Sequence, residues 1–160
     1  MPTTNQPVPP DAEVILRDFL LDQTEVTDLV GTRIATNLPR DAEMPFLVFV
    51  RAGGVLTRPT SQAHIQSALF PMVSFAGQWG GDDTKSVPDY ANSIALANAV
   101  IKVCYNTENV YVRTNTTDTK AKIYGFDILQ MPQRVDEIQS GLGRYDFSIA
   151  MTYRAVQSDY

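Results

Sequence analysis

Apolar residues recur at helical spacing near the start of the chain, directly after a proline-rich segment. Over residues 11–22 the apolar side chains fall on one side of a helix and most charged side chains on the other. A short second helical turn follows and stops at Gly31, because glycine readily takes the left-handed conformation that ends helices. The apolar positions of the two turns are Ala12, Ile15, Leu16, Phe19, Leu20, Val26, Leu29 and Val30.

The clearest helical pattern lies between Tyr90 and Asn106. Its apolar residues follow one another at intervals of four and three, at Tyr90, Ile94, Ala97, Ile101 and Cys104. Ser86 followed three residues later by Asp89 resembles a capping box, with Pro88 tolerated in the first turn. The sequence therefore predicts a long helix that is capped at Ser86 and ends at Tyr105–Asn106.

Five segments have the alternating or β-branched pattern of strands. Residues 46–50 are apolar on both faces, which suits a central strand. Pro71 cannot donate a backbone hydrogen bond, so the segment 68–77 is predicted to be an edge strand or to contain a bulge. The remaining strand candidates are 110–114, 120–130 and 144–154, the last with one apolar and one wetter face.

The order of these elements predicts the fold class. Helix, strands, helix, strands is typical of an α+β fold, here a mostly antiparallel mixed sheet with two main helices packed on one face. Two long polar loops are expected, at 55–66 and 133–143. Residues 1–10 contain four prolines and little that is apolar, so we expect a flexible arm there and a single domain over 11–160.

Composition and charge argue against several classes of protein. Hydrophobic residues make up 44% of the 160 and charged residues 19%, which is against a disordered or highly charged tail protein. With 13 basic and 18 acidic residues the net charge is −5, so a basic nucleic-acid-binding protein is not expected. No apolar run reaches the length of a membrane span and no signal-peptide pattern is present, so composition alone favours a soluble cytoplasmic domain.

The acidic surplus is confined to one short segment. Between Asp11 and Asp28 the chain has six acidic residues and one basic residue, Arg17. The rest of the chain has as many bases as acids. The net charge of the protein is therefore a property of its first predicted helical region.

The sequence shows no convincing catalytic or metal-binding pattern. Cys104 falls on the apolar stripe near a helix C-terminus, where a thiolate is disfavoured, so we expect a core thiol. His64 has no neighbour at metal-ligand spacing and is expected in a solvated loop. Residues 81–83 (Gly-Asp-Asp) are interpreted as a turn, and 141–143 (Gly-Leu-Gly) precede a strand, so neither is expected to hold magnesium or phosphate.

Asp136, Glu137 and Trp79 are three further candidates for a functional role. Asp136 and Glu137 are adjacent carboxylates, which favours a solvated loop pair over a catalytic dyad because a dyad needs an enclosing pocket. Trp79 beside two glycines either contacts a partner or caps the core. We therefore expect no catalytic residue, no cofactor and no metal ion.

Four segments occur together in an informative order. VTDLVGTRIATNLP (26–39) contains a hydrophobic–Gly–x–Arg–Ile turn, and MPFLVFVRAGG (44–54) places a proline before a strongly apolar strand. YANSIALANAVIKVCYN (90–106) has the pattern of a long alanine-rich helix, and GLGRYDFSIAMTYR (141–154) that of a glycine–Arg–Tyr sequence before an alternating strand. In this order they resemble the tail terminators of long-tailed bacteriophages, also called tail-completion or minor tail proteins. The resemblance covers most of residues 11–156, but not 106–120.

The resemblance implies a structural virion protein and not an enzyme. Members of this family form a ring, usually of six subunits, at the head-proximal end of the tail tube. There they end tube polymerisation and present a surface to the head-completion or stopper proteins. DNA would pass through the lumen without specific binding, no membrane would be involved, and the protein would be located in the virion after assembly in the host cytoplasm.

Such a ring needs one face that matches the tube and an opposite face that does not, and the two polar loops can supply them. The candidate partner-interface residues are Arg58, His64, Trp79, Arg134, Asp136 and Glu137. Charge reversal at Arg58 and Arg134 is expected to reduce assembly and leave the fold intact. The acids of the segment 11–28 face either the lumen, where they would let DNA slide, or the solvent as an ordinary polar helix face.

Two other functions remain open on the sequence. One is another neck or tail component, such as a head-closure or tail tube protein; a tube subunit should form filaments on its own, whereas a terminator should remain a ring or a monomer. The other is a small-molecule-binding domain or a hydrolase, which needs a convergent polar pocket.

Overall fold

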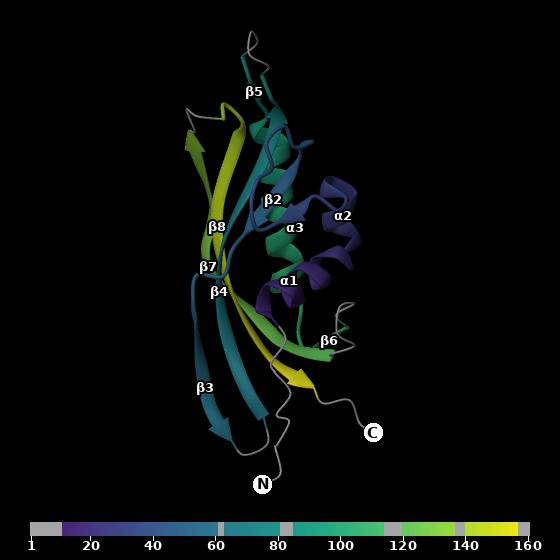
Figure 1. The fold of residues 1–160 in the computed structure, drawn as a ribbon, viewed down its shortest axis with the longest axis vertical. Coiled ribbons are helices and arrows are strands. Elements are labelled where there is room, and N and C mark those ends of the chain that lie inside the picture. Colours follow the sequence, from purple (N-terminus) through teal and green to yellow (C-terminus); the bar gives the residue numbers. More distant parts are fainter. Residues whose placement is uncertain (1–10, 61–62, 81–84, 114–119, 137–139, 157–160) are drawn as a thin grey trace.

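Helices on one side of a curled sheet make up the architecture (Figure 1). The computed structural model describes residues 11–60, 63–80, 85–113, 120–136 and 140–156. In these residues the sheet is mixed and mostly antiparallel, and the fold is α+β. The fold class predicted from the order of elements is confirmed.

Three long strands form the frame of the sheet. The order across it is β1-β2-β4-β8-β7-β6, and β3 and β5 also pair with β4. Each described pairing is antiparallel except that of β1 with β2. The strands are β1 (Ile34–Ala35), β2 (Phe46–Phe49), β3 (Gly54–Thr60), β4 (Ala63–Gln78), β5 (Val87–Pro88), β6 (Val110–Arg113), β7 (Lys120–Asp136) and β8 (Gly143–Val156).

The first two helices lie where the periodicity places them. They are α1 (Ala12–Leu21) and α2 (Thr24–Val30). Asp11 caps α1, and its carboxylate accepts a hydrogen bond of 3.0 Å from the amide of Glu13. Gly31 follows α2 with a φ of 58°, as predicted for the residue at which this helix stops.

The long helix α3 (Tyr90–Tyr105) is confirmed, but its predicted cap is wrong. Its N-cap is Asp89, whose side chain accepts from the amide of Asn92 at 3.0 Å. The Ser86 hydroxyl instead accepts from the amide of Gly80 at 2.9 Å. Pro88 lies in β5, opposite Gly77 of β4. The capping box fails because the Ser86 hydroxyl binds the Gly80 amide and does not cap the helix.

Strand residues occupy most of the first predicted long loop and part of the second. Most of 55–66 belongs to β3 and β4, which form a hairpin in which Pro59 pairs with His64. The segment 133–143 contains the last residues of β7 and the first of β8. The β3–β4 hairpin extends beyond the helix layer (Figure 1). A hairpin there has no core to face, so it needs no apolar alternation and its sequence looks like a loop.

Pro71 lies inside the sheet, so the prediction of an edge or bulge at this residue is wrong. On one side, β4 pairs with β8 continuously through Pro71, without a register shift. On its other side, β4 pairs first with β3 and then with β2, which follow one another along its length. Leu69 uses both backbone groups, accepting from Ala52 at 2.8 Å and donating to Gly53 at 3.1 Å. Pro71 only accepts, from Val50 at 3.4 Å. Its missing N–H therefore falls where the partner changes from β3 to β2.

The Gly–x–Arg–Ile turn ties β1 to the entrance of β2. The Nε atom of Arg33 donates to the carbonyl oxygen of Pro45 at 2.8 Å, and the amide of Leu47 donates to the carbonyl of Arg33 at 3.0 Å. The Met44–Pro45 peptide bond is cis. The conspicuous arginine of this motif thus has a structural role within the subunit.

The core lies between the helices and the sheet. α3 packs across β4, β7 and β8, while α1 packs beside α2 and β6. The ring of Phe19 on α1 lies 5.1 Å from that of Phe126 on β7. Cys104 is fully buried in this layer, which confirms the predicted core thiol.

Candidate interaction surface

The two faces of the sheet differ in what covers them. Along β4, Ala68, Phe70 and Met72 are buried against the helices, and the residues between them point to the other side. Among the described residues no helix lies on that second side (Figure 1). We call it the open face.

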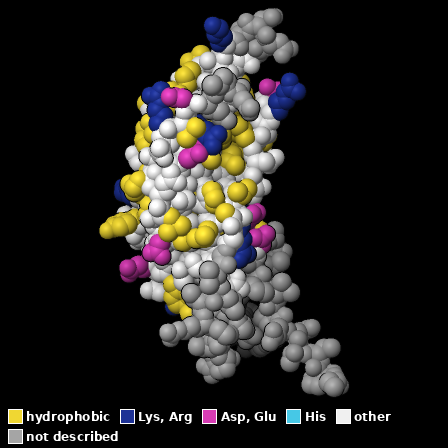
Figure 2. Space-filling model, turned by 90° about the vertical axis from the view of Figure 1, so that its left-hand side faces the viewer, with side chains coloured by type: hydrophobic (Ala, Val, Ile, Leu, Met, Phe, Trp, Pro, Cys, Tyr) yellow, Lys and Arg dark blue, Asp and Glu magenta, His cyan; other side chains and the backbone are white. Residues whose placement is uncertain are grey.

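Apolar side chains run across the middle of the open face. Leu69 is 38% exposed and Val50 44%, whereas Phe46 and Phe75 are nearly buried against their neighbours in the sheet. Figure 2 shows the strand side of the molecule, with hydrophobic side chains spread between charged ones. The residues of this apolar stripe are Phe46, Val48, Val50, Leu69, Pro71, Val73, Phe75 and Ala150. Exposed apolar side chains beside charged ones make this stripe a candidate interaction surface.

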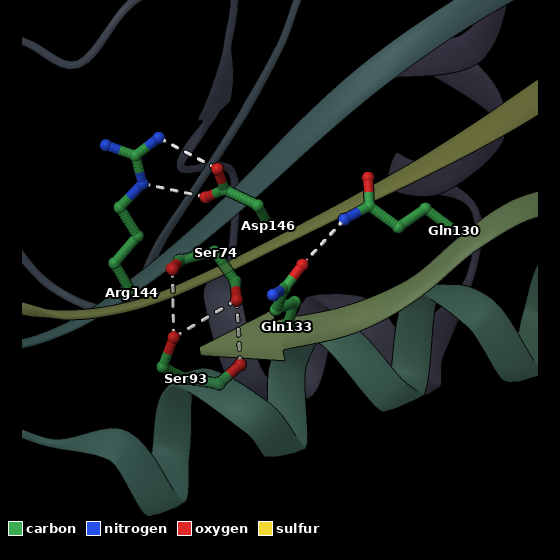
Figure 3. Close-up of polar contacts among 6 residues, drawn as sticks. All are labelled: Ser74, Ser93, Gln130, Gln133, Arg144 and Asp146. Carbon is green, nitrogen blue, oxygen red and sulfur yellow. Dashed lines mark hydrogen bonds and ion pairs between the residues drawn. The ribbon is translucent and has the colours of Figure 1, made fainter. Parts of the chain in front are cut away.

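A bidentate ion pair borders the stripe. In β8, Arg144 Nε and Nη2 donate to the two carboxylate oxygens of Asp146 at 2.7 and 2.9 Å (Figure 3). The Arg144 guanidinium also lies 5.9 Å from the ring of Phe75 in the paired strand. Both charged side chains are about two-thirds buried or more, with 26% and 32% exposed. Such a pair gives the open face a fixed polar feature beside its apolar residues.

A cluster of cations and tyrosines occupies the open face where β6, β7 and β8 meet. Lys122 Nζ lies 5.7 Å from the ring of Tyr111 and 5.0 Å from that of Tyr124. The Arg154 guanidinium lies 5.9 Å from the Tyr124 ring. The exposed side chain of Arg113 stands on the same face as Tyr111, two residues along β6. We call these five residues the cation–aromatic cluster.

The end of β7 is joined to the start of α3 by a second polar cluster. The Arg134 guanidinium stacks 3.6 Å from the centre of the Tyr90 ring, and its Nε donates to Asp136 at 3.0 Å. The Tyr90 hydroxyl donates to the same carboxylate oxygen of Asp136 at 3.1 Å. The hydrogen bond to Asp136 raises the pKa of Arg134 above its ordinary value. Arg134 is thus held in place although it is exposed.

The six residues chosen from the sequence do not form one site. Arg58 on β3 and His64 on β4 belong to the hairpin at one end of the molecule. Arg134 and Asp136 lie together at the end of β7, and this end of the strand is at the other end of the molecule (Figure 1). Trp79 follows β4 and is half-buried; its Nε1 atom is buried without a hydrogen-bond partner among the described residues. Glu137 lies outside the described residues.

Sequence reasoning missed the cation–aromatic cluster. Its residues come from three strands, with Lys122 opposite both Tyr111 of β6 and Arg154 of β8. In the sequence, Lys122 and Tyr124 alternate with buried residues, which identifies an outward face but not its neighbours. The register of the sheet was needed to bring these side chains together.

A groove of about 360 Å³ lies between the end of α1 and β6. Both polar and apolar residues line it, including Asp22 and Glu108. The other lining residues are Phe19, Gln23, Asn106, Thr107, Val110, Tyr111 and Val112. The groove is large enough for a small molecule.

The chain was compared with known proteins. No protein-family model and no curated protein sequence matches it. Within the described ranges, His, Cys, Asp and Glu side chains do not gather in threes or more as a metal ion would require. None of the described helices is long and apolar enough to cross a membrane.

Proposed function

We propose that this protein is a structural subunit of a long-tailed bacteriophage, similar to the tail terminators. In this proposal it forms a ring of six subunits at the head-proximal end of the tail tube. The ring ends tube polymerisation and offers the joining surface to the head-completion proteins. The subunit acts by binding and not by catalysis, without a cofactor, and DNA passes through the ring without specific binding.

The open face is the observation on which the proposal rests. It leaves Val50 and Leu69 exposed beside the Arg144–Asp146 pair, a combination of apolar area and fixed polar groups that suits a protein partner. The helix layer lies on the opposite side of the sheet (Figure 1). A subunit that places its helix layer on the open face of the next one joins two unlike surfaces. Contacts of this kind repeat by rotation and can close into a ring.

The two ends of the molecule support different partners at the two faces of the ring. The β3–β4 hairpin lies at one end, and β5, the end of β7 and the start of β8 lie at the other (Figure 1). Arg58 and His64 belong to the first end, and Trp79, Arg134 and Asp136 to the second. Two chemically different ends allow one ring face to match the tube and the other to match the head-completion proteins.

Assembly with the tail tube protein tests this function. Solution mass and electron microscopy should show discrete rings that cap short tubes when the two proteins are mixed. Long filaments of this chain alone would instead identify a tail tube subunit. The absence of both rings and capped tubes would contradict the proposal.

A pair of matched variants connects this test to the open face. Leu69→Asp places a charge in the apolar stripe and should prevent ring formation while the monomer stays folded. Val87→Asp changes an aliphatic residue of β5 that is 56% exposed, at the end of the molecule, and should leave the ring intact. Equal effects of the two variants would show that the open face is not the lateral contact.

The groove beside α1 favours a second candidate, a small-molecule-binding domain. Its lining includes Asp22, Glu108 and Tyr111, which could hold a polar ligand. Screening by protein NMR with a library of polar metabolites tests this candidate. Chemical-shift changes confined to residues of the groove would support this candidate. If no ligand changes these chemical shifts, the structural role is favoured.

A further inference from the structure

The cation–aromatic cluster and the acidic end of the first two helices form a complementary pair of surfaces. We infer that the cluster of one copy binds the side chains of Asp22, Glu25 and Asp28 of the next copy. We call these three residues the acidic patch. This inference rests on the proposed ring and specifies the charged contact that would hold neighbouring subunits together.

Among the described residues, no anion is paired with the cations of the cluster. Lys122 and Arg154 are directly opposite each other in the paired strands β7 and β8. Like charges in that position destabilise a sheet. Among the residues that the structure describes, neither Lys122, Arg154 nor Arg113 has a carboxylate partner. Among these described residues, the Nε atom of Arg154 is also buried without a hydrogen-bond partner.

The tyrosines of the cluster position its cations for an incoming group. Lys122 lies over two tyrosine rings, and Arg154 shares one of them. Ring contacts of this kind orient a cation without neutralising its charge. Tyr111 is 62% exposed, so the cluster is open to a partner. A carboxylate is the group that would neutralise the opposed cations.

The acidic patch is placed where its charge does not help the helices. Asp22 is the C-cap of α1, and Asp28 lies in the last turn of α2. Both face the negative end of a helix dipole, where an acid is unfavourable, and both are exposed. Glu25, in the first turn of α2, forms an exposed ion pair with Lys102 at 3.1 Å. Helix stability therefore explains Asp11 and Glu13 but not Asp22 and Asp28.

A second copy of the chain is the occupant that fits these charges. The acidic patch belongs to the helix layer and the cluster to the open face; Asp22 and Tyr111 line one groove, but among the described residues no carboxylate of the patch pairs with a cation of the cluster. Two clusters placed face to face would repel each other, which excludes a contact of cluster with cluster. A head-to-tail contact pairs opposite charges and repeats around a ring.

Nucleic acid is the competing source of an anion. Cations interleaved with aromatic rings also suit phosphates and bases. The whole chain has a net charge of −5, which opposes approach of a polyanion. Binding of DNA by the cluster is therefore one of the outcomes that the test must distinguish.

Reversal of charge on each surface tests the contact. We would prepare one variant with Lys122→Glu and Arg154→Glu, a second with Asp22→Lys and Asp28→Lys, and a chain with all four changes. Each two-residue variant alone should associate at least about tenfold more weakly than the unaltered chain, because like charges then meet at every contact. An equimolar mixture of the two variants should assemble again, since every contact between unlike copies pairs opposite charges. The four-residue variant should assemble too.

The measurement is sedimentation velocity over a range of protein and salt concentrations. Near-ultraviolet circular dichroism checks that each variant is folded. A control with Arg40→Glu and Glu43→Lys changes two exposed charges outside both surfaces and should associate normally. A second control with Asp118→Asn and Asp159→Asn removes two carboxylates near β7 and β8 in the sequence and should also associate normally.

Cross-linking gives an independent readout. A carbodiimide joins a lysine amine directly to a carboxylate, and a mixture of isotope-labelled and unlabelled protein distinguishes links between copies from links within one. We expect a link between copies from Lys122 to a peptide that contains Asp22 or Asp28. Such a link would be absent in the Lys122→Gln variant.

Two results would overturn the inference in different ways. If the unaltered chain forms rings and the charge-reversed variants form them equally well, the contact is wrong while the ring proposal survives. If the unaltered chain forms no assembly alone or with the tail tube protein, both fail. Binding of a DNA duplex or single strand that is lost with Lys122→Glu and Arg154→Glu, without any change in self-association, would assign the cluster to nucleic acid instead.

Discussion

Ser74 of β4 and Ser93 of α3 bind each other through both their hydroxyls and their backbones (Figure 3). The Ser74 hydroxyl donates to the carbonyl oxygen of Ser93 at 2.9 Å, and the Ser93 hydroxyl donates to the carbonyl of Ser74 at 2.8 Å. The two hydroxyl oxygens are 3.1 Å apart, and both residues are fully buried. This pair fixes the height of α3 on the sheet, where apolar packing alone would allow it to slide.

Removal of one hydroxyl should therefore destabilise the subunit. Ser93→Ala leaves a buried carbonyl with one partner fewer, and we expect a loss of about 1–3 kcal/mol in the free energy of unfolding. Urea denaturation measures it. Ser148→Ala, on the open face, is the control and should change stability by less than about 0.5 kcal/mol. The double variant Ser74→Ala with Ser93→Ala should cost less than the sum of the single changes; strict additivity would show that the two do not act as a pair.

Gly143 should not accept a side chain. A Cβ atom at this position would lie 2.6 Å from the carbonyl carbon and 2.7 Å from the carbonyl oxygen of Asp89, the residue that caps α3. These are backbone atoms, so Gly143→Ala should cost about 1–3 kcal/mol of stability or more. At Gly125 the nearest atom to a Cβ is the Thr107 carbonyl oxygen at 3.8 Å, and Gly125→Ala should fold with near-normal stability. Thermal unfolding of both variants tests the difference, and equal losses would contradict it.

The Cys104 thiol should be unreactive in the folded protein. Burial raises its pKa well above the ordinary value of 9.0. A thiol reagent such as Ellman's should react slowly with the native chain and quickly after denaturation, because only the thiolate attacks. Fast reaction in native conditions would mean that the helix layer opens readily.

The same burial gives stability a dependence on alkaline pH. Above pH 9.0 the unfolded thiol loses its proton and the folded thiol keeps it, so this contribution to stability is complete below pH 9.0 and declines as the pH rises further. Cys104→Ala lacks the contribution. Denaturation midpoints measured below and above pH 9.0 should therefore fall more steeply for the unaltered chain than for Cys104→Ala.

Arg134 allows the role of one end of the molecule in assembly to be tested without changing the apolar stripe of the open face. Arg134→Glu breaks the stack on Tyr90 and the ion pair with Asp136. Because both charged side chains are largely exposed, the melting temperature should change little, while assembly with partner proteins should weaken. Arg134→Lys keeps the charge but loses the planar stack and should have an intermediate effect. Normal capping of tubes by Arg134→Glu would remove this residue from the interface.

Neutralising the acidic patch should make the isolated subunit more stable. Asp22→Asn and Asp28→Asn each remove a negative charge from the C-terminal end of a helix, and each should add about 0.3–1 kcal/mol to the free energy of unfolding. Asp11→Ala should do the opposite and cost about 1 kcal/mol, since Asp11 caps the N-terminus of α1. Urea denaturation of the dilute monomer measures whether each change raises or lowers the free energy of unfolding. A loss of stability with Asp22→Asn would mean that this carboxylate supports the fold itself.

Local features of the sequence were sufficient for the helices and for part of the sheet. The helical spacing of apolar residues predicts α1 and α3, and Gly31 predicts the end of α2. Their information lies within a few consecutive residues, so no knowledge of distant contacts is needed. The same holds for the burial of Cys104, which follows from its place on the apolar stripe of a helix.

Where neighbouring strands changed the meaning of a residue, local features were misleading. Pro71 has no N–H to donate and looks like an edge residue, yet it lies where β3 gives way to β2 along one side of β4. Ser86 has the spacing of a helix cap, yet it binds Gly80 in the preceding turn. The polar segments near Arg58 and Arg134 look like loops because strands beyond the helix layer need no apolar face.

By itself the sequence determined which segments are helical, which residues form the helix side of the core, and that the acidic surplus belongs to residues 11–28. Only the tertiary structure decided that Lys122 faces Arg154 and that one side of the sheet stays uncovered. The physical reason is the separation along the chain of the residues that decide each feature. Helical periodicity is written into neighbouring residues, whereas the register of strands joins residues far apart in the chain, and a shift of one position would turn every side chain to the other face.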